Sequence, residues 1–214
     1  MTSFIFDLDG TLSDTIPLIK QTTSQALARF GLSACDEEIA GFIGIPLVVV
    51  GEHFLGADRK EEYMQAFFEH YHQHNKEVKA FPGLPEMLTQ LQAKGAKLAI
   101  ATSKRRLPAY DTLEIIGLRH FFPVVVHSEC NCGFKPGPGP VERAIADLGG
   151  DPAQSWFIGD SVHDIASAKA AGISSVGVTW GVTTRDKLAE AEPDYLCDEV
   201  GELHELLLRL LPAD

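Results

Sequence analysis

The chain has 214 residues, of which 45% are hydrophobic and 22% charged, and these are ordinary proportions for a globular protein. Its formal net charge of −12 argues against nucleic acid or an anionic membrane surface as a partner, because both require a basic face. The charge is compatible with a small anionic substrate, provided that a few lysine or arginine side chains converge locally.

Neither a membrane span nor a cleaved signal peptide is expected, because no apolar run approaches the ~18 residues that a span requires and the motif pattern begins as early as Asp7. The scattered cysteines, Cys35, Cys130, Cys132 and Cys197, favour free thiols in a cytoplasmic protein. Cys130 and Cys132 form a C-x-C pair without a second half, so a zinc site is not expected.

The first predicted element is a buried strand, "SFIFDLD" at 3–9. The interval that follows contains no convincing strand. It holds helical patterns at 18–31, 46–56 and 59–79.

This break in the pattern predicts a helical cap domain over 15–81, inserted into an α/β core formed by 1–14 and 82–214. The Pro82-Gly83 pair supplies a sharp turn at the second boundary.

Beyond the cap, short apolar runs alternate with amphipathic helical patterns, most of which end at glycine. The runs are 97–103, 122–128, 155–160 and 174–180, and the helical patterns are 84–95, 107–118, 140–150 and 161–172. This alternation predicts a Rossmann-like parallel sheet with helices on both faces.

Polar side chains follow several of these strands, at the end of a parallel sheet where functional residues collect. They are Asp7 and Asp9, Thr102 to Lys104, Lys135, and Asp160 with Asp164. Carboxylates gathered in one cleft need a cation, and ligands that are all oxygen favour Mg²⁺. A hydroxyl and an ammonium group are the donors that a phosphoryl group requires, while a carboxylate could attack phosphorus.

Each motif has a simpler explanation when it stands alone. "DLDG" is consistent with a tight turn, "ATSK" with a polar strand end, "KPGPGP" with a rigid connection, and "GDSVHD" with a helix N-cap. Their occurrence together, in order and each near a predicted strand end, favours a catalytic site.

In this order, "DLDGTL", "ATSK", "KPGPGP" and "GDSVHD" resemble the four motifs of the haloacid dehalogenase-like hydrolase superfamily. The resemblance extends from Phe4 to about Gly181. The cap and its "FPG" exit resemble the branch that contains phosphoglycolate phosphatases, pyrophosphatases and β-phosphoglucomutases.

The resemblance implies that Asp7 is the nucleophile and that Asp9 is the general acid and base. It also implies a Mg²⁺ ion bound by Asp7, Asp160 and the backbone carbonyl of Asp9, with Asp164 supporting the site from behind these ligands or through water. Because dehalogenases that attack carbon lack the second acidic residue, Asp9 favours phosphoryl transfer.

The resemblance further implies that Thr102 and Lys135 bind the transferred phosphoryl group. Ser103 stands where asparagine is frequent and can still donate one hydrogen bond. Gly10 and Thr11 would shape the turn after the nucleophile.

The predicted function is hydrolysis of a small phosphomonoester through an aspartyl-phosphate. Leu47 is followed by three valines where relatives often offer a polar cap residue, which weakens the case for phosphoglycolate and suggests a less polar leaving group or a packed interface. A phosphomutase, a pyrophosphatase, and a signalling module that merely accepts phosphate on Asp7 remain alternatives. The partner is a small phosphorylated metabolite, and the chain is a monomer or a homodimer.

Two further features are left open by the sequence. His70 and His74 lie on one helical face and could bind a metal, although a solvated cap surface explains them better. Lys104 to Arg106 either guide an anionic substrate or are surface charges.

Overall fold

The computed structural model describes residues 1–212, whose strands form a six-stranded parallel sheet in the order β3-β2-β1-β4-β5-β6. The strands are β1 (Ser3–Phe6), β2 (Lys97–Ala101), β3 (Val124–Val126), β4 (Ser155–Gly159), β5 (Ser174–Val178) and β6 (Tyr195–Cys197). The predicted α/β fold with a Rossmann-like sheet is therefore confirmed.

Helices precede or follow each strand, and a block of them separates β1 from β2. They are α1 (Ile16–Ala28), α2 (Asp36–Phe42), α3 (Leu47–Leu55), α4 (Lys60–His74), α5 (Leu84–Ala93), α6 (Arg106–Ile115), α7 (Gly139–Leu148), α8 (Val162–Ala170), α9 (Arg185–Glu190) and α10 (Val200–Arg209), with short 3-10 turns at Asn75–Glu77, Arg119–Phe121 and Pro152–Gln154. No helix within residues 1–212 combines the length and the apolar character needed to cross a membrane.

Alternate side chains of β1 pack against opposite layers, as the two-residue period of a strand requires. Phe4 and Phe6 belong to the core cluster that includes α5 and α10, whereas Ile5 belongs to the cluster that includes α7. Both faces of the sheet are thus covered, which explains the continuous apolar run of this strand.

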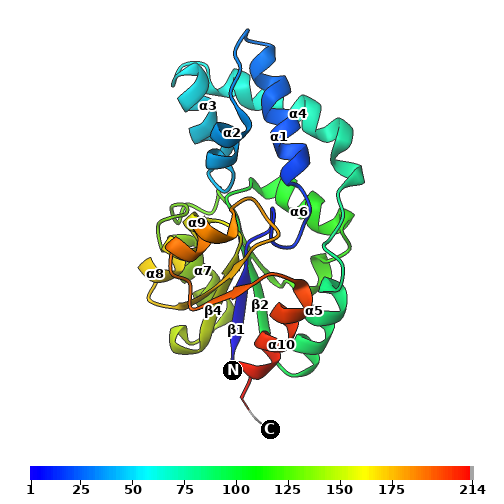
Figure 1. Cartoon of the computed structure of the whole chain (residues 1–214), viewed down its shortest axis with the longest axis vertical. Coiled ribbons are helices and arrows are strands. Elements are labelled where there is room, and N and C mark those ends of the chain that lie inside the picture. The colour runs from blue at the N-terminus through cyan, green and yellow to red at the C-terminus, as the bar shows by residue number, and fades with distance from the viewer. Residues whose placement is uncertain (213–214) are drawn as a thin grey trace.

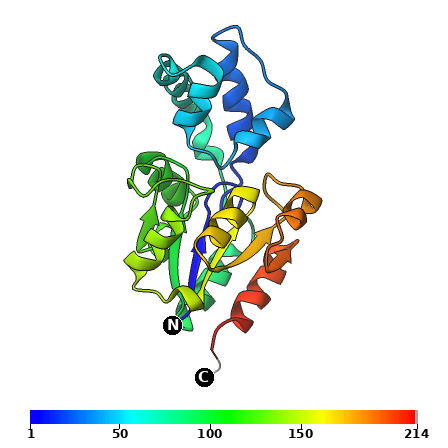
Figure 2. The ribbon, with the colours of Figure 1, turned by 90° about the vertical axis from the view of Figure 1, so that its left-hand side faces the viewer.

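Helices α1 to α4 form the cap, a separate group above the carboxyl ends of the strands (Figures 1 and 2). Helix α4 packs against α1 and α3, and its buried residues Tyr63, Phe67 and Tyr71 recur every four positions on one face. The cap therefore has an apolar core of its own. The domain boundaries at 15 and 81 remain predictions.

Several elements differ from those predicted. The first strand ends at Phe6 rather than residue 9, because the amides of Leu12 and Ser13 both donate to the Leu8 carbonyl and close a turn. Helix α2 was not predicted, since Ile39 is its only buried residue and no apolar period is visible. The outermost strand, β6, was missed because it is only three residues long and partly exposed.

Candidate active site

The order of the strands reverses between β1 and β4, and the crevice above such a reversal is where parallel α/β sheets bind ligands. Asp7 directly follows β1 and Asp160 directly follows β4. Phe6 is paired with Ile158, and the Asp7 amide donates to the Ile158 carbonyl at 2.8 Å. Strand register alone therefore brings the first and last motifs together.

Three buried carboxylates meet at this point, and we refer to Asp7, Asp160 and Asp164 as the acid cluster. One oxygen from each lies within 4.8 Å of the others. The Nζ atom of Lys135 lies 2.7 Å from Asp7 Oδ1 and 2.6 Å from Asp164 Oδ1. A single buried lysine thus pairs with two of the three carboxylates.

Burial dominates the titration of the acid cluster. It raises the pKa of Asp7 from 3.8 to about 7, with Lys135 acting in the opposite direction. Burial and the neighbouring carboxylates raise the pKa of Asp160 well above its ordinary value. Burial lowers the pKa of Lys135, but Asp164 and Asp7 outweigh it and hold this pKa above its usual range. The cluster is short of positive charge, and its all-oxygen donor set fits a hard divalent cation.

We expect the stability of the cation-free protein to depend on the Asp7 titration. An acid whose pKa rises on folding contributes stability that is present below its unfolded value of 3.8 and is lost as the pH rises through about 7. In excess chelator, the melting temperature of Asp7→Asn minus that of the wild type should be larger by several degrees at about pH 8 than at about pH 4.5. Differential scanning calorimetry measures both, and a pH-independent difference would contradict the raised pKa.

Asp160 is oriented by hydrogen bonds from two distant segments. Thr11 Oγ1 donates to its Oδ1 at 2.9 Å, and the Val182 amide donates to its Oδ2 at 2.7 Å. Gly10, at φ +84°, and Gly181 both lie so close that a Cβ on either would collide with the Asp160 carboxylate. These glycines allow the two turns to close around the aspartate.

Asp164 combines two roles that the sequence presented as alternatives. Ser161 is the N-cap of α8, and the backbone amide of Ser161 donates to Asp164 Oδ2 in a capping box. The other oxygen of Asp164 accepts from Lys135. The helix cap therefore holds the carboxylate that positions the lysine.

The Asp9 carboxylate lies outside the acid cluster, and it faces the cap. Its Oδ1 accepts from Thr15 Oγ1 at 2.7 Å and from Lys104 Nζ at 2.6 Å. Lys104 Nζ also lies 4.9 Å from the ring centre of Tyr71 in α4. Burial lowers the pKa of Lys104, but the Asp9 carboxylate outweighs it and raises this pKa above its usual range.

The second motif begins where β2 ends. Thr102 and Ser103 are both buried. Thr102 Oγ1 accepts from the Lys104 amide at 3.2 Å, which leaves its own proton free to donate. Ser103 Oγ has no hydrogen-bond partner in the part of the chain that the structure describes. A buried hydroxyl without a partner is costly, so it is suited to a bound ligand.

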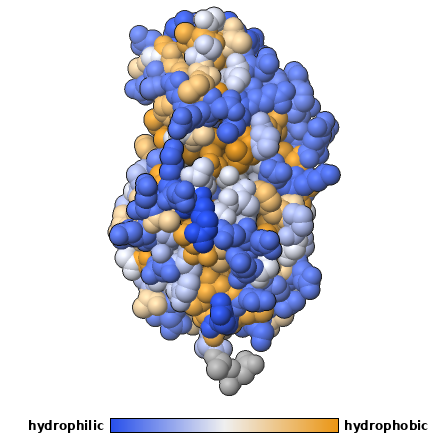
Figure 3. All heavy atoms as spheres, in the orientation of Figure 1, coloured by the Kyte–Doolittle hydropathy of each residue, from blue (hydrophilic) through white to orange (hydrophobic). Residues whose placement is uncertain are grey.

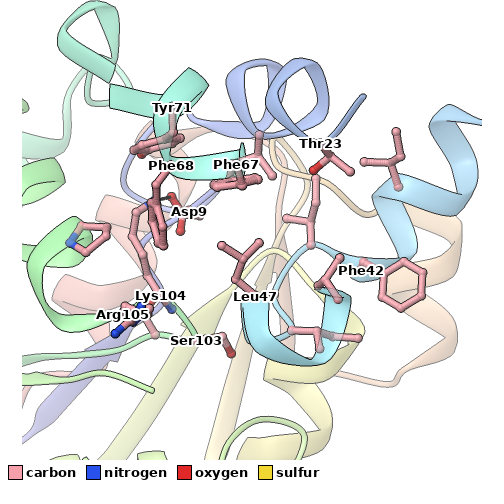
Figure 4. Close-up of a pocket in the computed structure, with 18 of the residues that line it drawn as sticks. Asp9, Thr23, Phe42, Leu47, Phe67, Phe68, Tyr71, Ser103, Lys104 and Arg105 are labelled. Atoms are coloured by element: carbon pink, nitrogen blue, oxygen red, sulfur yellow. Dashed lines mark hydrogen bonds and ion pairs between the residues drawn. The ribbon is translucent and has the colours of Figure 1, made fainter. Parts of the chain in front are cut away.

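Core and cap enclose a common space, which we call the cap cavity (Figure 4). Its volume of about 80 Å³ is several times the ~10–15 Å³ that one water requires. The core contributes Asp7, Asp9, Thr102, Ser103, Lys104 and Arg105. The cap contributes chiefly apolar side chains, among them Ile39, Phe42, Leu47, Val50, Phe67 and Phe68.

The structure brings together the predicted site residues from all four motifs, although Lys135, Asp160 and Asp164 contact or adjoin Asp7 without lining the cap cavity themselves. Sequence reasoning missed Thr15 and the Val182 amide. Only the position of Gly181 and Val182 directly after a predicted strand could have indicated the latter.

His70 and His74 have no third candidate metal ligand beside them within residues 1–212. Their rings stack with centroids 4.5 Å apart, His70 Nδ1 lies 3.0 Å from Thr22 Oγ1, and the acid cluster is the only described group of three candidate metal ligands.

The six-stranded parallel sheet and the helical cap define a capped Rossmann-like α/β protein, with a polar site where the two meet. Residues 4–178 match the family described as haloacid dehalogenase-like hydrolase, and this chain belongs to that family of enzymes.

Relatives in this family extend over nearly the whole chain. The pyrophosphatase PpaX of Oceanobacillus iheyensis is 31% identical over 94% of both chains, and the probable phosphatase IndB of Dickeya dadantii is 36% identical over 95% of this chain and 94% of its own. A predicted phosphoglycolate phosphatase from Haemophilus somnus has a TM-score of 0.86 at 26% identity, covering 96% of this chain and 97% of that one. A hydrolase from Pseudomonas syringae superposes with a TM-score of 0.90 at 24% identity, over 99% of this chain and 100% of its own. This likeness shows that the two proteins share a fold.

Proposed function

We propose that this protein is a Mg²⁺-dependent phosphatase that hydrolyses a small phosphomonoester through an aspartyl-phosphate on Asp7. The observation that carries the proposal is that Asp7 and Asp9 line one cavity, while Asp160, Asp164 and Lys135 gather around Asp7. Nucleophile, acid and phosphate donors are thus within reach of one bound ester.

Asp7 is proposed as the nucleophile. Lys135 donates a hydrogen bond to Asp7 Oδ1, whereas Asp7 Oδ2 accepts no hydrogen bond from residues 1–212. The free oxygen can form a bond to phosphorus while the bond between phosphorus and the ester oxygen breaks, and the electron pair leaves with that oxygen.

Asp9 is proposed as the general acid and base. Thr15 and Lys104 both donate to its Oδ1, so Oδ2 can carry a proton without breaking either contact. In the first step this proton passes to the leaving oxygen. In the second step, Asp9 accepts a proton from the water that attacks phosphorus, and inorganic phosphate and free Asp7 result.

The phosphoryl group is proposed to lie between Thr102, Ser103 and Lys135. Thr102 and Ser103 have hydroxyl protons to donate, and Lys135 keeps one N–H beyond those directed at Asp7 and Asp164. Donors that are already in place stabilise the charge that develops on the phosphoryl oxygens.

Asp7 and Asp160 would hold the magnesium ion, with the Asp9 carbonyl as the further ligand that the family resemblance implies. When bound, the ion neutralises charge on the cluster and on the phosphoryl oxygens. Asp164 has one oxygen on Lys135 and the other on Ser161, so it orients the lysine.

A chelator should therefore reduce phosphate release from any substrate to background, because the carboxylates then repel both one another and the phosphoryl group. Phosphate release is measured with and without excess chelator, and again after Mg²⁺ is added back. Circular dichroism on the chelated sample serves as the control that the protein stays folded. Undiminished turnover in excess chelator would rule out the magnesium role.

A pyrophosphatase is the second candidate, because several relatives of similar length carry that name. A phosphomutase would use the same residues but return the phosphoryl group to the substrate. A signalling module would keep the phosphate on Asp7. Continuous release of inorganic phosphate from a monoester would exclude the phosphomutase and the signalling module. A comparison of the rates with a monoester and with pyrophosphate would distinguish a phosphatase from a pyrophosphatase.

A further inference from the structure

We propose that the alcohol released from the substrate is uncharged and apolar, either aromatic or branched aliphatic. This inference rests on the proposed function, and it names the class of ester that the cap cavity accepts.

The cap side of the cavity offers no charge. The cap residues that line the cavity lie between Ile19 and Tyr71, and none of those that the structure describes carries a charge. They come from all four cap helices and the α2–α3 connection. In Figure 4, Leu47 and Phe67 face each other across the middle of the space, while Lys104 and Arg105 lie at its left side. Apolar surface is also exposed at the waist between cap and core (Figure 3). A group that binds here exchanges water for aliphatic and aromatic contacts.

The two cations that border the cavity are already paired. Lys104 lies 2.6 Å from Asp9, with only 9% of its side chain exposed. Arg105 lies 2.7 Å from Glu129, which also accepts from the Arg106 amide. No unpaired lysine or arginine therefore lines the cavity in the described chain. A second anionic group on the substrate would lose its hydration without gaining a partner.

This arrangement discriminates between candidate esters. Phosphoglycolate carries a carboxylate on its leaving group, and pyrophosphate releases a phosphate. Both would place an anion among Leu47, Val50, Phe67 and Phe68. An aromatic or branched side chain would instead pack against Phe68, close to where Asp9 protonates the leaving oxygen.

The first test uses the full wild-type chain with Mg²⁺ and four small phosphate monoesters, together with pyrophosphate. Benzyl phosphate and 3-methylbutyl phosphate present apolar alcohols, whereas phosphoglycolate and glycerol 3-phosphate present charged or polar ones. We expect kcat/KM for phosphate release to be at least about tenfold higher for the two apolar esters than for the others and for pyrophosphate.

Equal or higher kcat/KM for phosphoglycolate, glycerol 3-phosphate or pyrophosphate would overturn the inference and leave the phosphatase proposal standing. If no compound releases phosphate, the proposed function fails and this inference fails with it. The two failures are therefore distinguishable.

A second test moves a positive charge into the cavity. Leu47 is half-buried at the start of α3 and lines the cavity, whereas Val49, two residues later on the same helix, does not. Leu47→Arg should lower kcat/KM for benzyl phosphate about tenfold and narrow or reverse its advantage over phosphoglycolate. Val49→Arg is the matched control and should preserve the wild-type ratio.

If Leu47→Arg keeps the wild-type ratio of kcat/KM for benzyl phosphate to that for phosphoglycolate, and its circular dichroism matches the wild type, the apolar cap residues do not contact the leaving group. The wild-type comparison of esters requires no variant, so it tests the inference even if Leu47→Arg does not fold.

Discussion

Asp7→Asn is expected to lower the rate of phosphate release by at least ~10⁴-fold, because the amide cannot serve as the nucleophile that forms the acyl-phosphate. The fold should persist. Asn keeps the shape of Asp7 and can still accept from Lys135 through its carbonyl oxygen, and it removes a buried carboxylate whose pKa burial raises to about 7. The melting temperature of this variant should therefore equal or exceed that of the wild type above about pH 7 when divalent cations are absent.

Steady-state phosphate release and calorimetry on the same preparation test both halves of this expectation. Asp111→Asn is the matched control, since Asp111 is exposed on α6 and takes part in none of the site contacts. It should have wild-type activity. Turnover in Asp7→Asn within tenfold of the wild type would refute the assignment of the nucleophile.

Lys135→Met is expected to be strongly destabilising as well as inactivating. The methionine fills a similar volume but leaves Asp7 and Asp164 buried without their cation. Removing one partner of a buried ion pair typically costs about 3–5 kcal/mol in the free energy of unfolding, which corresponds to a fall of roughly 10 °C in melting temperature. Phosphate release should fall at least ~100-fold, because a donor to the phosphoryl group is lost with the charge.

Lys169→Met provides the comparison, because Lys169 is half-exposed and its contact with Glu192 is 3.3 Å long at the surface. Its melting temperature should stay within about 2 °C of the wild type, since such exposed pairs contribute little. Calorimetry in chelator measures the two variants side by side. Equal melting temperatures would show that the acid cluster does not depend on Lys135.

The cap cavity bears on how this chain differs from its relatives. Pyrophosphatase and phosphoglycolate phosphatase are names attached to proteins that are about 26–33% identical to it. The carboxylates of Asp7 and Asp9 and the hydrogen-bond donors of the core could act on any substrate that carries a phosphoryl group. We propose that substrate choice depends on the cap, whose wall near Leu47 and Phe67 is apolar.

Much of the core followed from the sequence. Apolar runs of six or seven residues alternating with amphipathic segments predict a parallel sheet, and the ends of parallel strands share one edge. The closeness of Asp7 and Asp160 therefore followed from their positions after β1 and β4. The sequence also predicted that the cap is helical, because its amphipathic segments are long enough to show the apolar spacing of a helix.

The tertiary structure decided what no local pattern encodes. Lys104 reaches Asp9 across 95 positions, and the Val182 amide reaches Asp160 from 22 positions away. The cap cavity is assembled from four cap helices and from residues that follow β1 and β2. Local sequence sets the backbone conformation and the buried face of each element, because these depend on neighbours three or four residues away. Which side chains then share one cavity depends on how cap and core pack, and that is a property of the folded chain alone.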